Sequence, residues 1–229
     1  MYQIEDNGSR MGFHKSYMME NAGHALADFI ISKFGEDLFD KKIVFICGTG
    51  NNGGDAMVAT RHLSCNYGLN LFIIIVGNSN KIKTEEAKMN WILIQKLKKL
   101  TILYCDGDSF NPKSSHIEND EFIKKIISDS DIIIDGIFGT GIKDEVKEPQ
   151  KTIIGLINKS KAYVISVDVP SGIDPTTGTK KSVCVKADST ITFHRIKNGL
   201  LQSNTRKYCG EIYLEKIGIP CEAEEEVIL

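Results

Sequence analysis

The sequence lacks a long apolar run, since its strongly apolar stretches, such as residues 71–76, are far shorter than the roughly 20 residues of a membrane-spanning helix. The first residues, Met1 to Asp6, also lack the basic and then apolar pattern of a secretory signal peptide. We therefore expect no membrane partner and a cytoplasmic location.

The sequence has no excess of positive charge either. Its 28 lysines and arginines stand against 30 aspartates and glutamates, which gives a net charge of -2 and no general attraction for a polyanion. We expect neither nucleic acid nor an anionic membrane surface to be the main partner, although a local basic patch is compatible with this composition.

Cysteine pairs and flexible linkers are also missing. The six cysteines contain no CxxC pair and have no histidine at zinc-finger spacing, which argues against a structural zinc and a disulfide framework. We expect reduced and mostly buried thiols. With only 5 prolines and no low-complexity tract, the chain is expected to fold throughout as one domain, residues 1–229.

Short apolar runs alternate with helical patterns along most of the chain. Runs that are apolar at every position are typical of strands covered on both faces, as in a parallel sheet. We expect such strands at residues 43–47, 71–76, 102–105, 132–134 and 163–167, and two further edge strands at 190–193 and 210–214.

The expected helices lie between these strands and before the first of them. An amphipathic helix with two apolar lanes precedes the first strand, and Ser16 and Gly35 are its candidate cap and end. Further helices are expected over residues 54–65, from Thr84 with a stripe at Met89, Leu93, Leu97 and Leu100, over 120–127 and over 152–158. This alternation predicts an α/β fold, a Rossmann-like three-layer α/β/α sandwich with a mostly parallel central sheet.

The strongest local motif is Gly48-Thr49-Gly50-Asn51-Asn52-Gly53-Gly54-Asp55, between an expected strand and an expected helix. Glycines allow a ligand to approach the backbone, and free amides at the helix start attract a phosphate. The alternative is a tight glycine turn without a ligand. An ordinary dinucleotide site would also have an acidic residue after the second strand, where this chain has Gly77-Asn78-Ser79-Asn80, and a phosphate loop of the GxxxxGK[ST] type is absent.

Two more strands end in an acidic residue followed by glycines. Asp135 opens Asp135-Gly136-Ile137-Phe138-Gly139-Thr140-Gly141, and Asp168 opens Asp168-Val169-Pro170-Ser171-Gly172. Because the carboxyl ends of parallel strands line one edge of a sheet, Asp55, Asp135 and Asp168 could converge there. The alternative for Asp135 and Asp168 is a turn-making role.

Three acidic residues beside a phosphate site would repel an anionic ligand unless a cation lies among them or one is protonated. The oxygen donors at hand are the Asn52 amide, the Asp135 carboxylate and the Ser171 hydroxyl, which suit an alkali or alkaline-earth cation better than zinc. Lys197, in a basic loop after a late strand, either reaches a phosphate or belongs to a turn.

Taken together, these motifs resemble the NAD(P)H-hydrate epimerases, also known as the YjeF N-terminal domain family. The resemblance spans nearly the whole chain and rests on Met19-Glu20-Asn21-Ala22-Gly23, on the three glycine-rich motifs above, and on Ala187-Asp188 followed by residues 190–193. It implies a homodimer that interconverts the R and S forms of NADHX and NADPHX, which carry water added across the nicotinamide 5,6 double bond.

The resemblance also implies roles for individual residues. The metal ligands would be Asn52, Asp135 and Ser171, holding one K+ per subunit. The substrate would be bound by Asn51, Asn52, Gly53, Gly54, Asp55, Gly139, Thr140, Gly141, Ile142, Lys143, Asp144, Glu145 and Asp168. Many relatives carry a second, dehydratase domain; because the sequence ends at Leu229, we expect that activity to come from a separate NAD(P)HX dehydratase.

We take Asp168 as the candidate catalytic residue, a proton shuttle that helps the hydroxyl leave as water and lets water return to the other face of the ring. A neighbouring carboxylate could raise the pKa of Asp168 and so suit it to this role. Two alternatives stay open: a non-catalytic protein-interaction module of the same family, and an NAD-dependent dehydrogenase, which the missing ribose acid and the missing substrate domain disfavour.

Overall fold

A computed structural model of the chain describes residues 1–65, 68–107, 109, 117–142 and 144–225. In this part of the chain seven strands form one fully parallel sheet with the order β3-β2-β1-β4-β5-β6-β7. The strands are β1 (Lys42–Cys47), β2 (Asn70–Val76), β3 (Thr101–Cys105), β4 (Ile132–Gly136), β5 (Tyr163–Val167), β6 (Ser189–Phe193) and β7 (Glu211–Glu215). The predicted parallel α/β fold is confirmed, with strand bounds within two residues of the expected ones.

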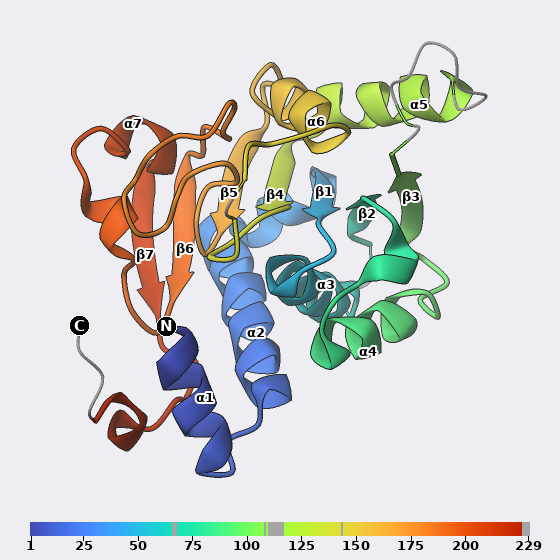
Figure 1. Cartoon of the computed structure of the whole chain (residues 1–229). Helices are drawn as coiled ribbons and strands as arrows, with labels where there is room; N and C mark the ends of the chain where they lie inside the picture. The colour runs from blue at the N-terminus through green and yellow to red at the C-terminus, as the bar shows by residue number, and fades with distance from the viewer. Residues whose placement is uncertain (66–67, 108, 110–116, 143, 226–229) are drawn as a thin grey trace.

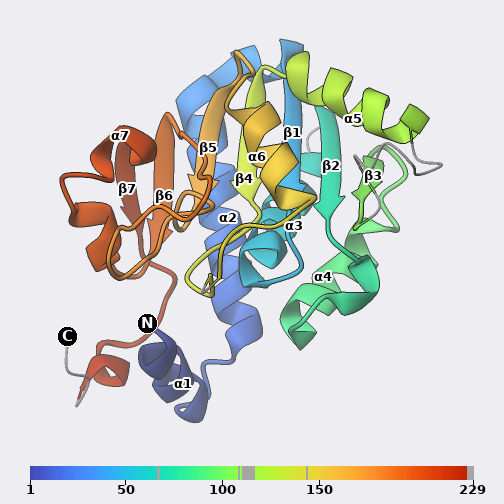
Figure 2. The ribbon, with the colours of Figure 1, turned by 45° about the horizontal axis from the view of Figure 1, so that its top comes forward.

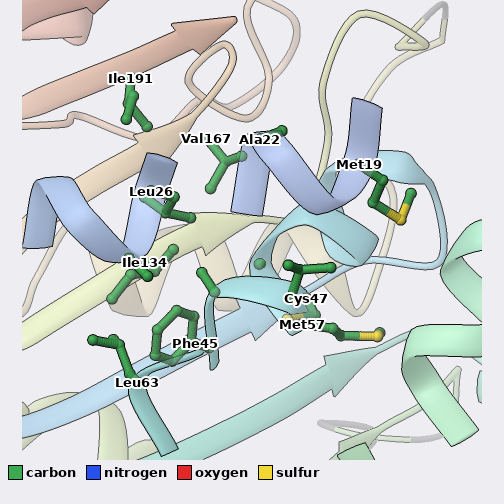
Figure 3. Close-up of a cluster of buried hydrophobic side chains, with 14 of the residues drawn as sticks. Met19, Ala22, Leu26, Phe45, Cys47, Met57, Leu63, Ile134, Val167 and Ile191 are labelled. Carbon is green, nitrogen blue, oxygen red and sulfur yellow. The ribbon is translucent and has the colours of Figure 1, made fainter. Parts of the chain in front are cut away.

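Helices cover both faces of the sheet (Figure 1). One face carries α2 (Lys15–Phe34), α3 (Asn51–Ser64) and α4 (Glu85–Ile94), and the other carries α5 (Ile117–Ser128) and α6 (Gln150–Ile157). The side chains alternate accordingly: Phe45 of β1 packs with the first set of helices, whereas Ile46 packs with the second. Figure 3 shows the first core, where Leu26 of α2 and Met57 of α3 lie over strand residues such as Phe45.

Two helix predictions need correction. α2 begins at Lys15 with His14 as its N-cap, so Ser16 lies inside the helix, whereas its predicted end at Gly35 is confirmed by a positive φ of 56°. The stripe predicted for α4 is wrong: Met89 is 50% exposed, and the helix ends at Ile94, before Leu97 and Leu100.

The buried face of α4 is formed instead by Ala87, Asn90, Trp91 and Ile94. The small Ala87 side chain lets α4 approach Gly54 of α3, where an added Cβ would lie 3.2 Å from the Ala87 Cβ. This close approach turns Trp91 and Ile94 inward and leaves Met89 and Leu93 outside. Thr84 is confirmed as the start, since its Oγ accepts a hydrogen bond from the Ala87 amide at 3.4 Å.

A short helix that the sequence pattern did not predict, α1 (Tyr2–Arg10), precedes α2. It packs on η4 (Cys221–Glu224) near the other end of the chain, as Figure 2 shows, and the Asn7 side-chain amide donates to the Ala223 carbonyl at 3.0 Å. Ile4 of α1 is fully buried. The helix lies at the end of the molecule to which the strands' carboxyl ends point.

The structure also describes the state of the cysteines and the character of the helices. All six cysteines are free thiols, and Cys47, Cys105, Cys184 and Cys209 are buried. Within the described residues, no helix combines the length and the apolar character that crossing a bilayer requires.

Candidate functional site

The glycine-rich turn after β1 leads directly into α3. Gly50 is the N-cap of α3 and has an extended conformation. Because glycine has no side chain that could cap the helix, the first backbone amides of α3 have no capping side-chain partner. A Cβ on Gly48 would lie 2.0 Å from the Ile137 carbonyl oxygen, and one on Gly53 would lie 2.0 Å from that of Gly48. Only glycine fits at these two positions, which keeps the start of α3 against the loop that follows β4.

A pocket of about 370 Å3 opens at this place, where the strand order reverses between β1 and β4. Ligands of doubly wound sheets bind in the crevice outside such a reversal. The predicted substrate-binding residues that line it are Asn51, Asn52, Asp55, Gly139, Thr140, Gly141, Ile142 and Asp168.

The other predicted substrate residues lie elsewhere. Gly53 and Gly54 are buried in the first turn of α3, behind the lining. Asp144 and Glu145 are exposed and do not line the pocket, and the Glu145 carboxylate accepts a hydrogen bond from the Ser182 amide. Lys143 lies outside the described residues. Substrate binding by these residues stays a prediction.

The three predicted metal ligands meet at the carboxyl end of β4. The Ser171 hydroxyl donates to Asp135 Oδ1 at 2.5 Å and lies 3.2 Å from the Phe138 carbonyl oxygen. The Asn52 side-chain amide donates to that same carbonyl at 3.0 Å and also to the Val167 carbonyl. Asn52 and Ser171 therefore both contact the Phe138 carbonyl, and Ser171 links that carbonyl to Asp135.

Asp135 is the most enclosed member of this group. It is fully buried and accepts further hydrogen bonds from the Ser166 hydroxyl at 2.8 Å and from the Ser171 amide at 2.9 Å. Burial raises the pKa of Asp135, and the hydrogen bonds from Ser171 and Ser166 oppose that shift. Among the described residues, no lysine or arginine forms an ion pair with it.

Asp168 follows β5 and is held in an unusual backbone conformation. Its φ is 64°, in the region that aspartate tolerates better than most residues. The Val169 amide donates to the Val167 carbonyl at 2.7 Å across it, which closes a three-residue turn and ends the strand. A strained residue at the mouth of a pocket is a recognised mark of a functional position.

The charged neighbour in contact with Asp168 is Lys197, not a carboxylate. The Lys197 ammonium forms an ion pair with Asp168 Oδ1 and donates to Thr192 Oγ1 at 3.1 Å and to the Phe193 carbonyl at 2.9 Å. Thr192 Oγ1 also donates to Asp168 Oδ1, at 3.1 Å. The hydrogen bonds that Asp168 accepts in the described structure all end on Oδ1, while the residue lines the pocket.

For Lys197 the sequence allows two alternatives, a phosphate contact or a place in a turn. The structure shows it 8% exposed, paired with Asp168 and lining the pocket. Its role depends on a partner far away in the sequence, so no local pattern signals it.

Three further carboxyl groups, those of Asp55, Glu5 and Glu86, line the same pocket. Asp55, in the first turn of α3, is 8% exposed, and burial raises its pKa well above the usual range, with smaller contributions from the charges of Asp168 and Glu5. Glu5 belongs to α1, which also contributes Tyr2 to the lining, and Met1, directly before the helix, lines the pocket too. The sequence patterns did not point to Met1, Tyr2 and Glu5 as pocket residues, because residues 2–10 carry too few apolar side chains to reveal a helical period.

The chain is similar to known proteins along nearly its whole length. The family described as "YjeF-related protein N-terminus" matches residues 15–199. A protein named NAD(P)H-hydrate epimerase from Nitrosopumilus maritimus (strain SCM1) is 40% identical over 228 residues, which cover 100% of this chain and 97% of that protein. A protein of the same name from Cenarchaeum symbiosum (strain A) is also 40% identical, with the same coverage.

A longer relative and a solved structure extend the comparison. A "Bifunctional NAD(P)H-hydrate repair enzyme Nnr" from Methanothermobacter thermautotrophicus is 36% identical over 98% of this chain, which corresponds to 40% of that protein. The crystal structure of the yeast protein YNL200c superimposes with a TM-score of 0.74 at 24% identity, covering 95% of this chain and 85% of that one. The yeast structure supports the fold.

Proposed function

Because the chain belongs to the family of the YjeF-related protein N-terminus, and relatives that match it over nearly their full length are named NAD(P)H-hydrate epimerase, we propose that it is such an epimerase. It interconverts the R and S forms of NADHX and NADPHX. The observation that carries the proposal is the pocket, in which the start of α3 and the Asp168–Lys197 pair lie together.

The start of α3 supplies the binding site for the pyrophosphate of the substrate. The backbone amides of its first turn and the positive end of the helix dipole attract a phosphate. The close packing of Gly48 and Gly53 lets the turn stay open on the pocket side. A pyrophosphate here directs the hydrated nicotinamide ring towards the remaining part of the pocket, which contains Asp168.

The reaction inverts a ring carbon that bears a hydroxyl and adjoins the ring nitrogen. A proton given to the hydroxyl lets it leave as water, while the nitrogen lone pair forms the C=N bond of a stabilised cation. Water then adds to the opposite face and releases a proton. Asp168 is the proton carrier, and Lys197 holds its Oδ1 and supplies a positive charge among the pocket's carboxyl groups.

The Asp135 cluster fits a potassium ion. Its oxygen donors are the Asp135 carboxylate, the Ser171 hydroxyl and the Phe138 and Val167 carbonyls, which are hard ligands of the kind that alkali cations accept. The Asn52 amide donates its Nδ2 to these two carbonyls, so it would turn its Oδ1 towards the ion to act as a ligand. The buried carboxylate, which no cationic side chain of the described chain pairs with, favours a cation there. One K+ per subunit, bound by Asn52, Asp135 and Ser171, would neutralise charge and hold the loop after β4 against α3.

Assembly and context complete the proposal. We expect a homodimer in the cytoplasm and a separate NAD(P)HX dehydratase in the same repair pathway, since the longer relatives are named as bifunctional repair enzymes. A non-catalytic interaction module of the same family would retain the fold while losing site residues. The presence of Asn52, Asp55 and Asp168 in the lining of one pocket, with Asp135 buried beside Ser171, supports the enzyme.

The test is an epimer assay. The purified protein is incubated with NADHX enriched in the R form, and the S form is followed by chromatography against a protein-free control, because the epimers also interconvert spontaneously. We expect the protein to accelerate the approach to the equilibrium mixture in proportion to its concentration. A rate equal to that of the control, with R-NADHX and with R-NADPHX, would reject the enzyme and favour the interaction module.

A further inference from the structure

Helix α1 places Glu5 in the wall of the pocket that contains Asp168. The helix is anchored by fully buried Ile4 and by Gly8, where an added Cβ would lie 3.0 Å from the Met18 side chain and 3.4 Å from that of Ile219. Glu5 follows Ile4 directly, so this anchoring fixes its position on the helix. Met1, one turn before Glu5, lines the pocket as well.

Glu5 has acidic neighbours, and the two nearby lysines already have other partners. The facing acids are Asp168 and Asp55, and Glu86 of α4 lines the same pocket. The facing bases are the amino terminus and two lysines: Lys197 is paired with Asp168, and Lys15 lies 2.5 Å from Asp6 Oδ1. In the described structure Glu5 itself forms no ion pair within 4.0 Å.

This environment favours a proton on Glu5. Burial is the main cause that raises the pKa of Glu5, and the charge of Asp168 adds to it, whereas Lys197, the amino terminus and Lys15 act in the opposite direction without reversing the shift. A carboxyl group whose pKa is raised keeps its proton to higher pH and can act as a general acid.

The chemistry of inversion asks for more than one proton carrier. Water leaves from one face of the ring and returns to the other, so a group on a single wall of the pocket is poorly placed for both events. Asp168 stands at the carboxyl end of β5, at the edge of the sheet, whereas Glu5 comes from α1 (Figure 2). The two carboxyl groups therefore reach one pocket from different elements of the fold.

We propose that Glu5 is a second catalytic carboxyl group, which divides the proton transfers of the epimerisation with Asp168; this inference rests on the proposed epimerase function. In one direction, Glu5 gives its proton to the substrate hydroxyl, the C–O bond breaks, and the nitrogen lone pair forms the C=N bond as water leaves. A water molecule then forms a new C–O bond on the opposite face, the C=N electrons return to nitrogen, and the Asp168 carboxylate takes the released proton.

The reverse direction exchanges the two roles, so protons and electrons balance over each turnover. Solvent resets the pair, since Asp168 loses the proton that Glu5 regains. The same geometry explains why a helix outside the sheet takes part in the site. It also assigns a function to residues 2–10, which precede the segment matched by the family comparison.

The test compares Glu5→Gln, Glu5→Asp and wild type in the epimer assay across pH. General acid catalysis typically contributes about 100-fold or more, so we expect Glu5→Gln to lower kcat by about 100-fold while KM changes little. The wild-type kcat falls as pH rises through the pKa of Glu5, because the protonated form is the acid. Glu5→Gln loses this limb of the profile, and Glu5→Asp retains it at a reduced rate.

A matched control makes the same substitution at a surface glutamate. Glu36 of η1 (Gly35–Asp40) is exposed and does not line the pocket, so Glu36→Gln removes a carboxylate and leaves kcat within about twofold of wild type. Stability is measured in parallel. Because the pKa of Glu5 is raised in the folded state, its ionisation opposes folding as pH rises, and the neutral Glu5→Gln variant is at least as stable as wild type at neutral pH.

The outcomes separate this inference from the function on which it rests. An active wild type with a Glu5→Gln variant of equal kcat and unchanged pH profile overturns the role of Glu5 alone. A Glu5→Gln variant that loses activity only through a raised KM also overturns it, because that result indicates substrate binding. An inactive wild type overturns both proposals.

Discussion

Replacing Lys197 by methionine tests whether the buried pair with Asp168 organises the pocket. Methionine retains most of the aliphatic stem and removes the ammonium, which bonds Asp168, Thr192 and Phe193. The side chains of Lys197 and Asp168 are only 7% and 10% exposed, so solvent screens the remaining charge weakly. Removing one partner of such a pair typically costs about 3–5 kcal/mol.

This cost has a measurable size in a protein of 229 residues. Because domains of 150–250 residues lose about 2–4 °C of Tm per kcal/mol, we expect Lys197→Met to lower Tm by roughly 10 °C. Guanidinium unfolding of Lys197→Met, Asp168→Asn and the double variant completes a double-mutant cycle. The double variant should be more stable than the sum of the single effects implies, by about 2 kcal/mol.

The control is an exposed pair of the same kind. Lys88 and Glu85 lie 2.7 Å apart on α4 with 46% and 87% exposure, so Lys88→Met should cost less than about 1 kcal/mol. If the Lys197 and Asp168 effects add within about 0.5 kcal/mol, the two side chains do not stabilise each other and the described pair is wrong. A Lys197→Met variant as stable as Lys88→Met would refute the reasoning equally.

Two further predictions concern the Asp135 cluster. Replacing KCl with tetramethylammonium chloride at equal ionic strength should lower the Tm of wild type. The Tm of Ser171→Ala should not change, because this variant lacks the hydroxyl between Asp135 and Phe138. An equal Tm shift in both proteins argues against the ion site. Gly139→Ala should weaken substrate binding at least about tenfold, because its Cβ would lie 2.2 Å from Asn52 Oδ1. The control is Gly155→Ala in α6, where no atom lies within 4 Å of the added Cβ. This control should bind substrate normally and be more stable than wild type by up to about 1 kcal/mol. Unchanged binding by Gly139→Ala would show that Asn52 need not hold its present position.

The sheet and the main motifs could be predicted because their signals are local. Strands buried on both faces must be apolar at successive positions, as in β1 and β2, and such runs stand out in the sequence. The motifs that begin at Gly48, Asp135 and Asp168 follow three of these strands, so parallel pairing alone brings them to one edge. The meeting of Asn52, Asp135 and Ser171 follows from that geometry.

The remaining features depend on contacts that local patterns do not encode. α4 has apolar side chains around most of its circumference, so its sequence does not show which face is buried. Trp91 is buried and Met89 is exposed because Ala87 packs closely against Gly54. Lys197 has the sequence context of a loop residue, and its ion pair with Asp168 is visible only in the folded structure. Glu5 gained its environment from the packing of α1 on η4, which joins the two ends of the chain.

The most direct test of the account compares the rates at which wild type and Asp168→Asn convert R-NADHX into the S form. Asparagine keeps the shape of the side chain and tolerates the positive φ of 64°, so the fold should persist, and Asp168→Asn/Lys197→Met serves as a second variant if the unpaired lysine destabilises the first. The control is Asp129→Asn. The Asp129 side chain is 45% exposed and lies near Lys42 at the start of β1, so it is at the amino ends of the strands, away from Asp168. We expect Asp168→Asn to bind substrate but to lose at least about 99% of the catalysed rate, in keeping with the usual contribution of a proton carrier. A folded Asp168→Asn variant that turns over at nearly the wild-type rate would contradict the central claim.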